Sequence, residues 1–186
     1  MLVTKILIVA ALESEFFTDE NFGQQIVYSG VGKINAARTL TEQILKNGPD
    51  LVLNVGTAGS LLPDLKGTFV VRDVIEHDMS AEPLTLRGST PFDSTSAILS
   101  SDMGTVRCAT GDSFVTEVDP WLTENSVDLV DMELFAVAKV CHFYNVTWRS
   151  LKYVSDYVDN DSAQSWTNSL ERASEEIQRA INLLLT

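Results

Sequence analysis

The sequence predicts an α/β fold in which helices flank a central sheet that is mixed and mostly parallel. Three observations support this: continuous apolar runs rich in β-branched residues, segments between them with apolar residues at helical spacing, and glycine-rich connections. Continuous apolar runs are typical of strands buried on both faces. Strands of that kind need helices on both sides of the sheet, so the alternation favours α/β.

Five apolar runs are expected to be the buried strands. The opening run KILIVAAL is too short to cross a bilayer, and it leads into Glu13 and Glu15 instead of a signal-peptide cleavage site. It therefore predicts a first strand. The expected strands are Ile6–Ala10, Leu51–Val55, Phe69–Ile75, Val127–Val130 and Trp148–Val154.

Three helices are expected from apolar residues that recur at helical spacing. They lie between Ile34 and Ile44, between Phe135 and Phe143, and between Leu170 and Leu184. The length of 186 residues suits one domain, 1–186. Residues 80–101 are rich in Ser, Thr and Pro, and we interpret them as an irregular excursion and not as a linker.

Three glycine-containing stretches are expected to form tight turns at strand ends. They are SGVGK (29–33), VGTAGSLLPDLKG (55–67) and ATGDSF (109–114). Ligands of open α/β sheets bind at such ends. SGVGK is not a phosphate-binding Walker motif, because Val27 stands where the first Gly is needed and Ile34 where Ser or Thr is needed.

Charge and cysteine content narrow the partners and the compartment. The chain carries 13 Lys and Arg against 26 Asp and Glu, a net charge of -13. This charge disfavours nucleic acid and anionic membranes and suits a small neutral or cationic ligand. Cys108 and Cys141 lack C-x-x-C spacing, which indicates buried thiols in a reducing cytoplasm.

Metal, cofactor and serine-hydrolase chemistry find little support in the sequence. His77 and His142 are the two histidines, and no suitable cysteine accompanies them, so a structural role is favoured for His77 and no metal site or cofactor is expected. The G-x-S-x-G elbow of Ser-His-Asp hydrolases does not occur.

Three carboxylates are more informative. Glu15 and Glu133 each follow an expected strand, and Asp156 follows the strand that ends in YVS. Singly, each could be an acid at a helix start that interacts with the helix dipole, and that interpretation has about even odds. Three acids at strand ends, beside glycine-rich turns, favour a common site.

The motifs together resemble a known family. The ordered set ALESE, SGVGK-x-NAA, LNVGTAG, HD, ATGDSF, VDMELFAVAKV and VSD is similar to purine nucleoside phosphorylases and nucleosidases, most closely to 5'-methylthioadenosine/S-adenosylhomocysteine nucleosidases. The resemblance implies a three-layer phosphorylase/hydrolase-like fold, cleavage of a purine nucleoside without cofactor or metal, and a homodimer.

The resemblance also implies roles for individual residues. Glu15 matches the carboxylate that orients the attacking water, and Asp156, oriented by Ser155, matches the group that handles the proton at purine N7. Substrate-binding roles fall on Glu133 and Met132 at the ribose, Phe114 and Val115 at the base, Thr57, Ala58 and Gly59 along the ligand, and Leu12 and Val31 at the 5' substituent.

The chemistry agrees with these roles. Breaking an N-ribosidic bond places positive charge on the sugar and negative charge on the departing purine, which calls for an anion beside the ring and an acid at the base. Met132 offers the sugar an apolar surface, and Glu133 can accept two hydroxyl hydrogen bonds.

Two alternatives to hydrolysis are a phosphate-dependent phosphorylase and a nucleoside-binding protein without turnover. Phosphorylases of this fold resemble the pattern G-D-P-x-R after the first strand and carry another Arg before the Gly-[ST] segment, where this chain has ALESE and Asn54. An acid where phosphate would bind repels it, and this favours water as the nucleophile. The resemblance implies a 5'-modified adenosine as the substrate.

The chain also departs from the family pattern. It is contracted between Glu15 and Ser29 and between Asp78 and Thr105, and Leu12 replaces a common Met. The 5' end of the substrate is therefore the part that the resemblance defines least.

Overall fold

The fold is a sheet of eight strands with helices on both faces. The structure is a computed structural model that describes residues 4–17, 24–159 and 162–185. Within these residues no helix is long and apolar enough to span a membrane. The elements in chain order are β1 (Ile6–Ala10), β2 (Gln25–Tyr28), α1 (Lys33–Asn47), β3 (Leu51–Ser60), β4 (Thr68–Glu76), β5 (Ile98–Ser100), β6 (Val106–Thr110), α2 (Pro120–Glu124), β7 (Leu129–Asp131), α3 (Leu134–Tyr144), β8 (Thr147–Tyr157) and α4 (Ser162–Leu185).

The strand order is β2-β1-β3-β7-β6-β4-β5, and β8 pairs with both β3 and β4. The pairs β1–β2, β1–β3, β3–β8, β4–β6 and β6–β7 are parallel, whereas β3–β7, β4–β5 and β4–β8 are antiparallel. The prediction of a mixed, mostly parallel sheet is confirmed. Strand β3 pairs with β8, β8 with β4, β4 with β6, β6 with β7, and β7 with β3 again. These five strands therefore form a closed ring, which brings their ends together.

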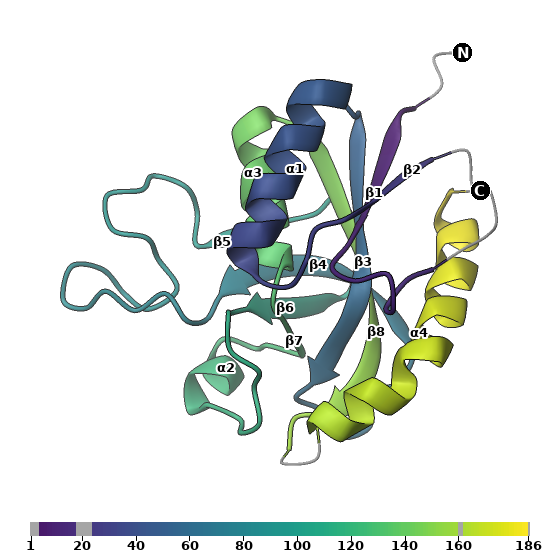
Figure 1. The fold of residues 1–186 in the computed structure, drawn as a ribbon. Coiled ribbons are helices and arrows are strands. Elements are labelled where there is room, and N and C mark those ends of the chain that lie inside the picture. The colour runs from purple at the N-terminus through teal and green to yellow at the C-terminus, as the bar shows by residue number, and fades with distance from the viewer. Residues whose placement is uncertain (1–3, 18–23, 160–161, 186) are drawn as a thin grey trace.

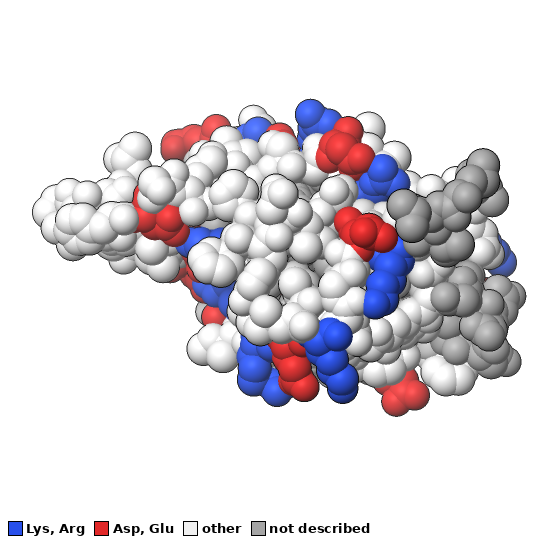
Figure 2. Space-filling model, turned by 90° about the horizontal axis from the view of Figure 1, so that it is seen from above, with Lys and Arg blue, Asp and Glu red and all other residues white. Residues whose placement is uncertain are grey.

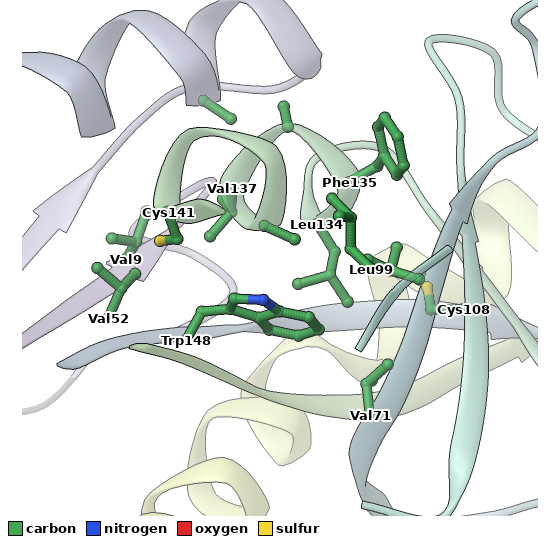
Figure 3. Close-up of a cluster of buried hydrophobic side chains, with 14 of the residues drawn as sticks. Val9, Val52, Val71, Leu99, Cys108, Leu134, Phe135, Val137, Cys141 and Trp148 are labelled. Carbon is green, nitrogen blue, oxygen red and sulfur yellow. The ribbon is translucent and has the colours of Figure 1, made fainter. Parts of the chain in front are cut away.

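Helices cover the sheet from both sides, which gives the predicted three layers (Figure 1). Helices α1 and α3 lie on one face. There Leu134, Val137 and Cys141 of α3 pack against strand residues that include Trp148 of β8 (Figure 3). Helix α4 lies on the other face and buries Ala173, Ile177 and Ile181 against β1, β3 and β8. Burial of these two stripes accounts for the helical periodicity of the sequence.

Two strands extend further than expected, one through a predicted turn and one past a predicted strand end. The glycine-containing segment Val55–Ser60 continues β3, and β8 extends through Asp156 to Tyr157, so this acid lies inside the strand and not beyond its end. The two strands pair along their whole length, and a register shift between Ala58 and Gly59 skips Ser155, which has no register partner on β3. Such a bulge re-aims side chains where a strand reaches a site.

Four short elements were not expected from the sequence: β2, β5, β6 and α2. Strand β2 lies at the sheet edge and is only partly buried, so its residues do not form a continuous apolar run. Strand β6 contains Ala109 and Thr110, the first two residues of ATGDSF, and only the rest of this motif is a loop.

The irregular excursion is confirmed for residues 80–97, which contain no helix or strand, while Ile98–Ser100 form β5. It projects from the sheet (Figure 1), and its surface is mostly uncharged (Figure 2). Arg87 anchors its base: Nε donates to the His77 carbonyl at 2.7 Å, and the guanidinium lies 4.6 Å from the Trp121 ring centroid.

Candidate active site

A cavity of about 200 Å³ opens where β1, β3, β6, β7 and β8 end. Every residue to which the sequence assigned a site role lines it, and their individual roles remain predictions. These residues are Leu12, Glu15, Val31, Thr57, Ala58, Gly59, Phe114, Val115, Met132, Glu133, Ser155 and Asp156. The cavity is also lined by five residues that the sequence did not suggest: Ala11, Ser113, Val130, Asp131 and Trp166.

Glu15 lies in a turn directly after β1. Its backbone N–H donates to the Leu12 carbonyl at 3.2 Å, which turns the chain back toward β3. Its Oε1 accepts hydrogen bonds from the backbone N–H of Thr57 at 3.3 Å and from the Thr57 hydroxyl. Although Glu15 is only 6% exposed, these two donors satisfy one carboxylate oxygen and fix its direction.

Glu133 lies between β7 and α3 and reaches the start of α1. Its Oε1 accepts from the N–H of Gly32 at 2.8 Å. Gly32 has φ of +94°, which places this N–H toward the carboxylate and which other residues rarely adopt. Burial and the neighbouring Asp131 raise the pKa of Glu133 to about 7, whereas Lys152 and the Gly32 hydrogen bond oppose this rise.

Asp131 and Lys152 form a buried ion pair behind Glu133. Lys152 Nζ lies 2.8 Å from Asp131 Oδ2, and both side chains are nearly inaccessible. Asp131 also accepts from the Thr110 hydroxyl at 2.5 Å and from the Leu134 N–H at 2.9 Å, which holds the start of α3. Burial alone raises the pKa of Asp131, but Lys152 and these donors hold it below its ordinary value. Burial lowers the pKa of Lys152, but Asp131 and Glu133 outweigh this effect and raise it.

Asp156 faces the same cavity from β8. Its Oδ1 accepts from the Ser155 hydroxyl at 2.5 Å. A side chain at Gly59 would place Cβ 3.0 Å from Asp156 Oδ2 and 3.2 Å from Val130. Glycine at position 59 therefore serves close approach between β3 and the carboxylate, and not the turn that the sequence suggested.

Trp166 closes the cavity from α4. Its Nε1–H donates to Thr57 Oγ1 at 2.9 Å, which links the C-terminal helix to β3. It lies four residues before Leu170 and therefore on the same face of the helix. From the sequence alone, Trp166 could not be distinguished from a core residue of that face. The sequence does contain a signal for a buried ion pair at Lys152. A lysine inside the apolar strand Trp148–Val154 must have a buried partner.

Positive side chains and metal-binding groups are missing from the described lining. No Lys or Arg is among the described residues that line the cavity, and the Lys152 charge is matched by Asp131. The described residues contain no group of His, Cys, Asp and Glu that could hold a metal ion. His77 is buried beside Gly111, and burial lowers its pKa.

The raised pKa of Glu133 predicts a pH dependence of stability. Between pH 4.5 and 7 the folded protein holds a proton that the unfolded chain releases, so this contribution to stability is complete below pH 4.5 and is lost as pH rises through 7. We expect the difference in unfolding free energy between wild type and Glu133→Gln to fall by about 3 kcal/mol over this range. Urea denaturation of both proteins across the range measures it, and parallel pH profiles would contradict the assignment.

The fold and the acid-lined cavity define a nucleoside-processing α/β protein, and the comparisons agree. Residues 22–186 match the Phosphorylase superfamily, and the chain belongs to this family. It is 32% identical over 187 residues to a 5'-methylthioadenosine/S-adenosylhomocysteine nucleosidase of Anoxybacillus flavithermus, covering 86% of this chain and 80% of that protein.

Two further comparisons extend over nearly the whole chain, including Glu15, which precedes the superfamily match. A Staphylococcus aureus protein of the same name is 26% identical over 208 residues, with 99% of this chain and 91% of that protein covered. The fold resembles a Helicobacter pylori 5'-methylthioadenosine nucleosidase variant with 5'-methylthioadenosine in its active site, with a TM-score of 0.87, 22% identity, and coverage of 98% of this chain and 99% of that chain.

Proposed function

We propose that this protein is an N-glycosyl hydrolase that cleaves the N-ribosidic bond of 5'-methylthioadenosine or S-adenosylhomocysteine and releases adenine. The observation that carries the proposal is the meeting of Glu15, Glu133 and Asp156 around one cavity. The names of the relatives from Anoxybacillus and Staphylococcus support the substrate class.

The three acids divide the reaction between them. Glu15 takes a proton from the attacking water, and Glu133 holds the ribose hydroxyls beside Met132. Asp156, steadied by the Ser155 hydroxyl, shares a proton with the purine as it leaves. The negative charge of Glu15 beside the sugar stabilises the cation that forms in the transition state. As in inverting glycosidases, one carboxylate activates water while the other carboxyl group assists the leaving group.

Water is a better nucleophile than phosphate for this cavity. Phosphate recognition uses cationic forks, and the described lining offers none. The Glu15 carboxylate, which lines the cavity, would also repel an anion such as phosphate. The phosphorylase alternative is therefore not favoured.

A substrate screen with and without phosphate tests the proposal. Methylthioadenosine, S-adenosylhomocysteine, adenosine and inosine are incubated with the protein, and free base is measured by chromatography. We expect adenine release from the first two at a rate that is the same in phosphate-free buffer. A rate that rises with phosphate, with a sugar 1-phosphate as product, would establish a phosphorylase. Adenine binding without any release would establish a nucleoside-binding protein.

We also propose a homodimer in the cytoplasm. The family resemblance supports the second copy, and so do the exposed side chains of Leu84, Leu86 and Phe92 on the projecting residues 80–97, of which Phe92 is 99% exposed. Two buried free cysteines, Cys108 and Cys141, support a reducing compartment. Residues 18–23, within the first contracted region, lie outside the described residues.

A further inference from the structure

The C-terminal helix α4 contacts the Glu15 segment in two places, although about 150 residues separate them in the chain. One contact is the chain of hydrogen bonds from Trp166 through Thr57 to Glu15. The other joins Ser174 and Gln178 to the backbone of Phe17. Both contacts bear on the direction of a carboxylate that the proposed reaction needs.

The first contact fixes the direction of a hydroxyl. Indole Nε1–H is only a donor, so Trp166 must use Thr57 Oγ1 as an acceptor. The single Thr57 hydroxyl hydrogen is then directed at Glu15 Oε1, which also accepts the Thr57 backbone N–H at 3.3 Å. Hydrogen bonds in series strengthen one another, and a bond to a carboxylate is stronger than a neutral one.

The second contact holds the backbone that follows Glu15. The Phe17 N–H donates to Ser174 Oγ at 3.0 Å, and the Phe17 carbonyl accepts from the Ser174 hydroxyl at 2.8 Å and from the Gln178 amide at 2.5 Å. Phe16 is fully buried in the cluster that contains Ala173, Ile177 and Ile181. Helix α4 thus holds the turn after β1 in place, and Trp166 adds a link to its carboxylate.

The two links leave one oxygen of Glu15 for chemistry. Oε1 is engaged by both Thr57 donors, while no hydrogen bond within the described residues engages Oε2. A base that activates water needs one oxygen free and pointed at the water. We propose that Trp166 is a positioning residue of the base-release reaction, acting through the Thr57 hydroxyl to hold Glu15 in this orientation. This inference rests on the proposed function.

Trp166→Phe tests the link because it keeps an aromatic ring and removes only the N–H donor. We expect kcat for adenine release from methylthioadenosine to fall about tenfold, with little change in KM, because orientation of the base affects the chemical step. In a Thr57→Val background the same substitution should have no further effect, since the link is already broken. Trp121→Phe, on α2 outside the cavity, is the matched control and should keep the wild-type kcat.

An unchanged kcat in Trp166→Phe, or an equal loss in the Thr57→Val background, would overturn the inference while leaving the proposed function intact. Failure of the wild-type protein to release adenine would instead remove the proposed function.

The indole N–H resonances test the link without enzyme activity. The chain has three tryptophans, so nitrogen-labelled protein gives three indole signals. Glu15→Gln should shift the Trp166 signal more than those of Trp121 and Trp148, because charge at Glu15 polarises the shared Thr57 hydroxyl. Equal or absent shifts would show that the indole does not sense Glu15.

Discussion

Replacing Glu15 with glutamine is expected to lower kcat for adenine release by about 10²–10⁴-fold, the range typical of general base catalysis. The amide has nearly the same shape and can still accept from Thr57, so the cavity should keep its form. It cannot take a proton from water. Steady-state adenine release from methylthioadenosine measures the loss, and calorimetric binding of adenine shows whether the cavity is preserved.

The same loss is expected for Asp156→Asn, because the departing purine then lacks a carboxyl group with which to share a proton. Glu13→Gln is a matched control, since Glu13 is exposed two residues from Glu15 and does not line the cavity. Rates of Glu15→Gln and Asp156→Asn equal to that of the control would mean that both acids are only structural.

Lys152→Met is expected to destabilise the protein by about 3–5 kcal/mol, the cost of leaving a buried charge without its partner. Asp131 and Lys152 are both nearly inaccessible and lie 2.8 Å apart, so removal of the ammonium leaves the Asp131 carboxylate unmatched beside Glu133. The free energy of unfolding from urea denaturation measures the effect.

Two further variants show whether the loss of stability in Lys152→Met comes from the unpaired charge or from changed packing. Lys139→Met breaks a partly exposed ion pair with Asp93, so it should cost less than about 1 kcal/mol. Lys152→Met combined with Asp131→Leu removes both charges and should recover part of the stability that the single substitution loses. If Lys152→Met and Lys139→Met cost the same, the buried pair does not stabilise the acid cluster as described.

Much of the fold could be predicted because the buried strands are continuous apolar runs. Ile6–Ala10 was predicted with its observed bounds, whereas β3 and β8 extend further than their apolar cores. Glycine at 56 and 59 resembled a turn in the sequence. In the structure Gly59 gives room for Asp156 and Val130 beside the strand, and that need arises only when β3 pairs with β8 and β7.

The cavity residues found by sequence all belong to short motifs with unusual composition. Trp166 and Asp131 were missed for a different reason, because their places depend on contacts far along the chain. Trp166 shares the stripe of Leu170, and only the packing of α4 against β3 reveals its hydrogen bond to Thr57. Asp131 is part of the VDMELFAVAKV motif, but its partner Lys152 lies on another strand.

Carboxylates around one cavity are expected to stabilise a cationic sugar. The most direct test is to measure by calorimetry the affinities of two adenine nucleoside analogues. One has a protonated pyrrolidine nitrogen in the sugar ring, and the other has an uncharged cyclopentane in its place. We expect the cation to bind at least about 10²-fold more tightly. Equal affinities would show that the acids do not stabilise positive charge at the sugar.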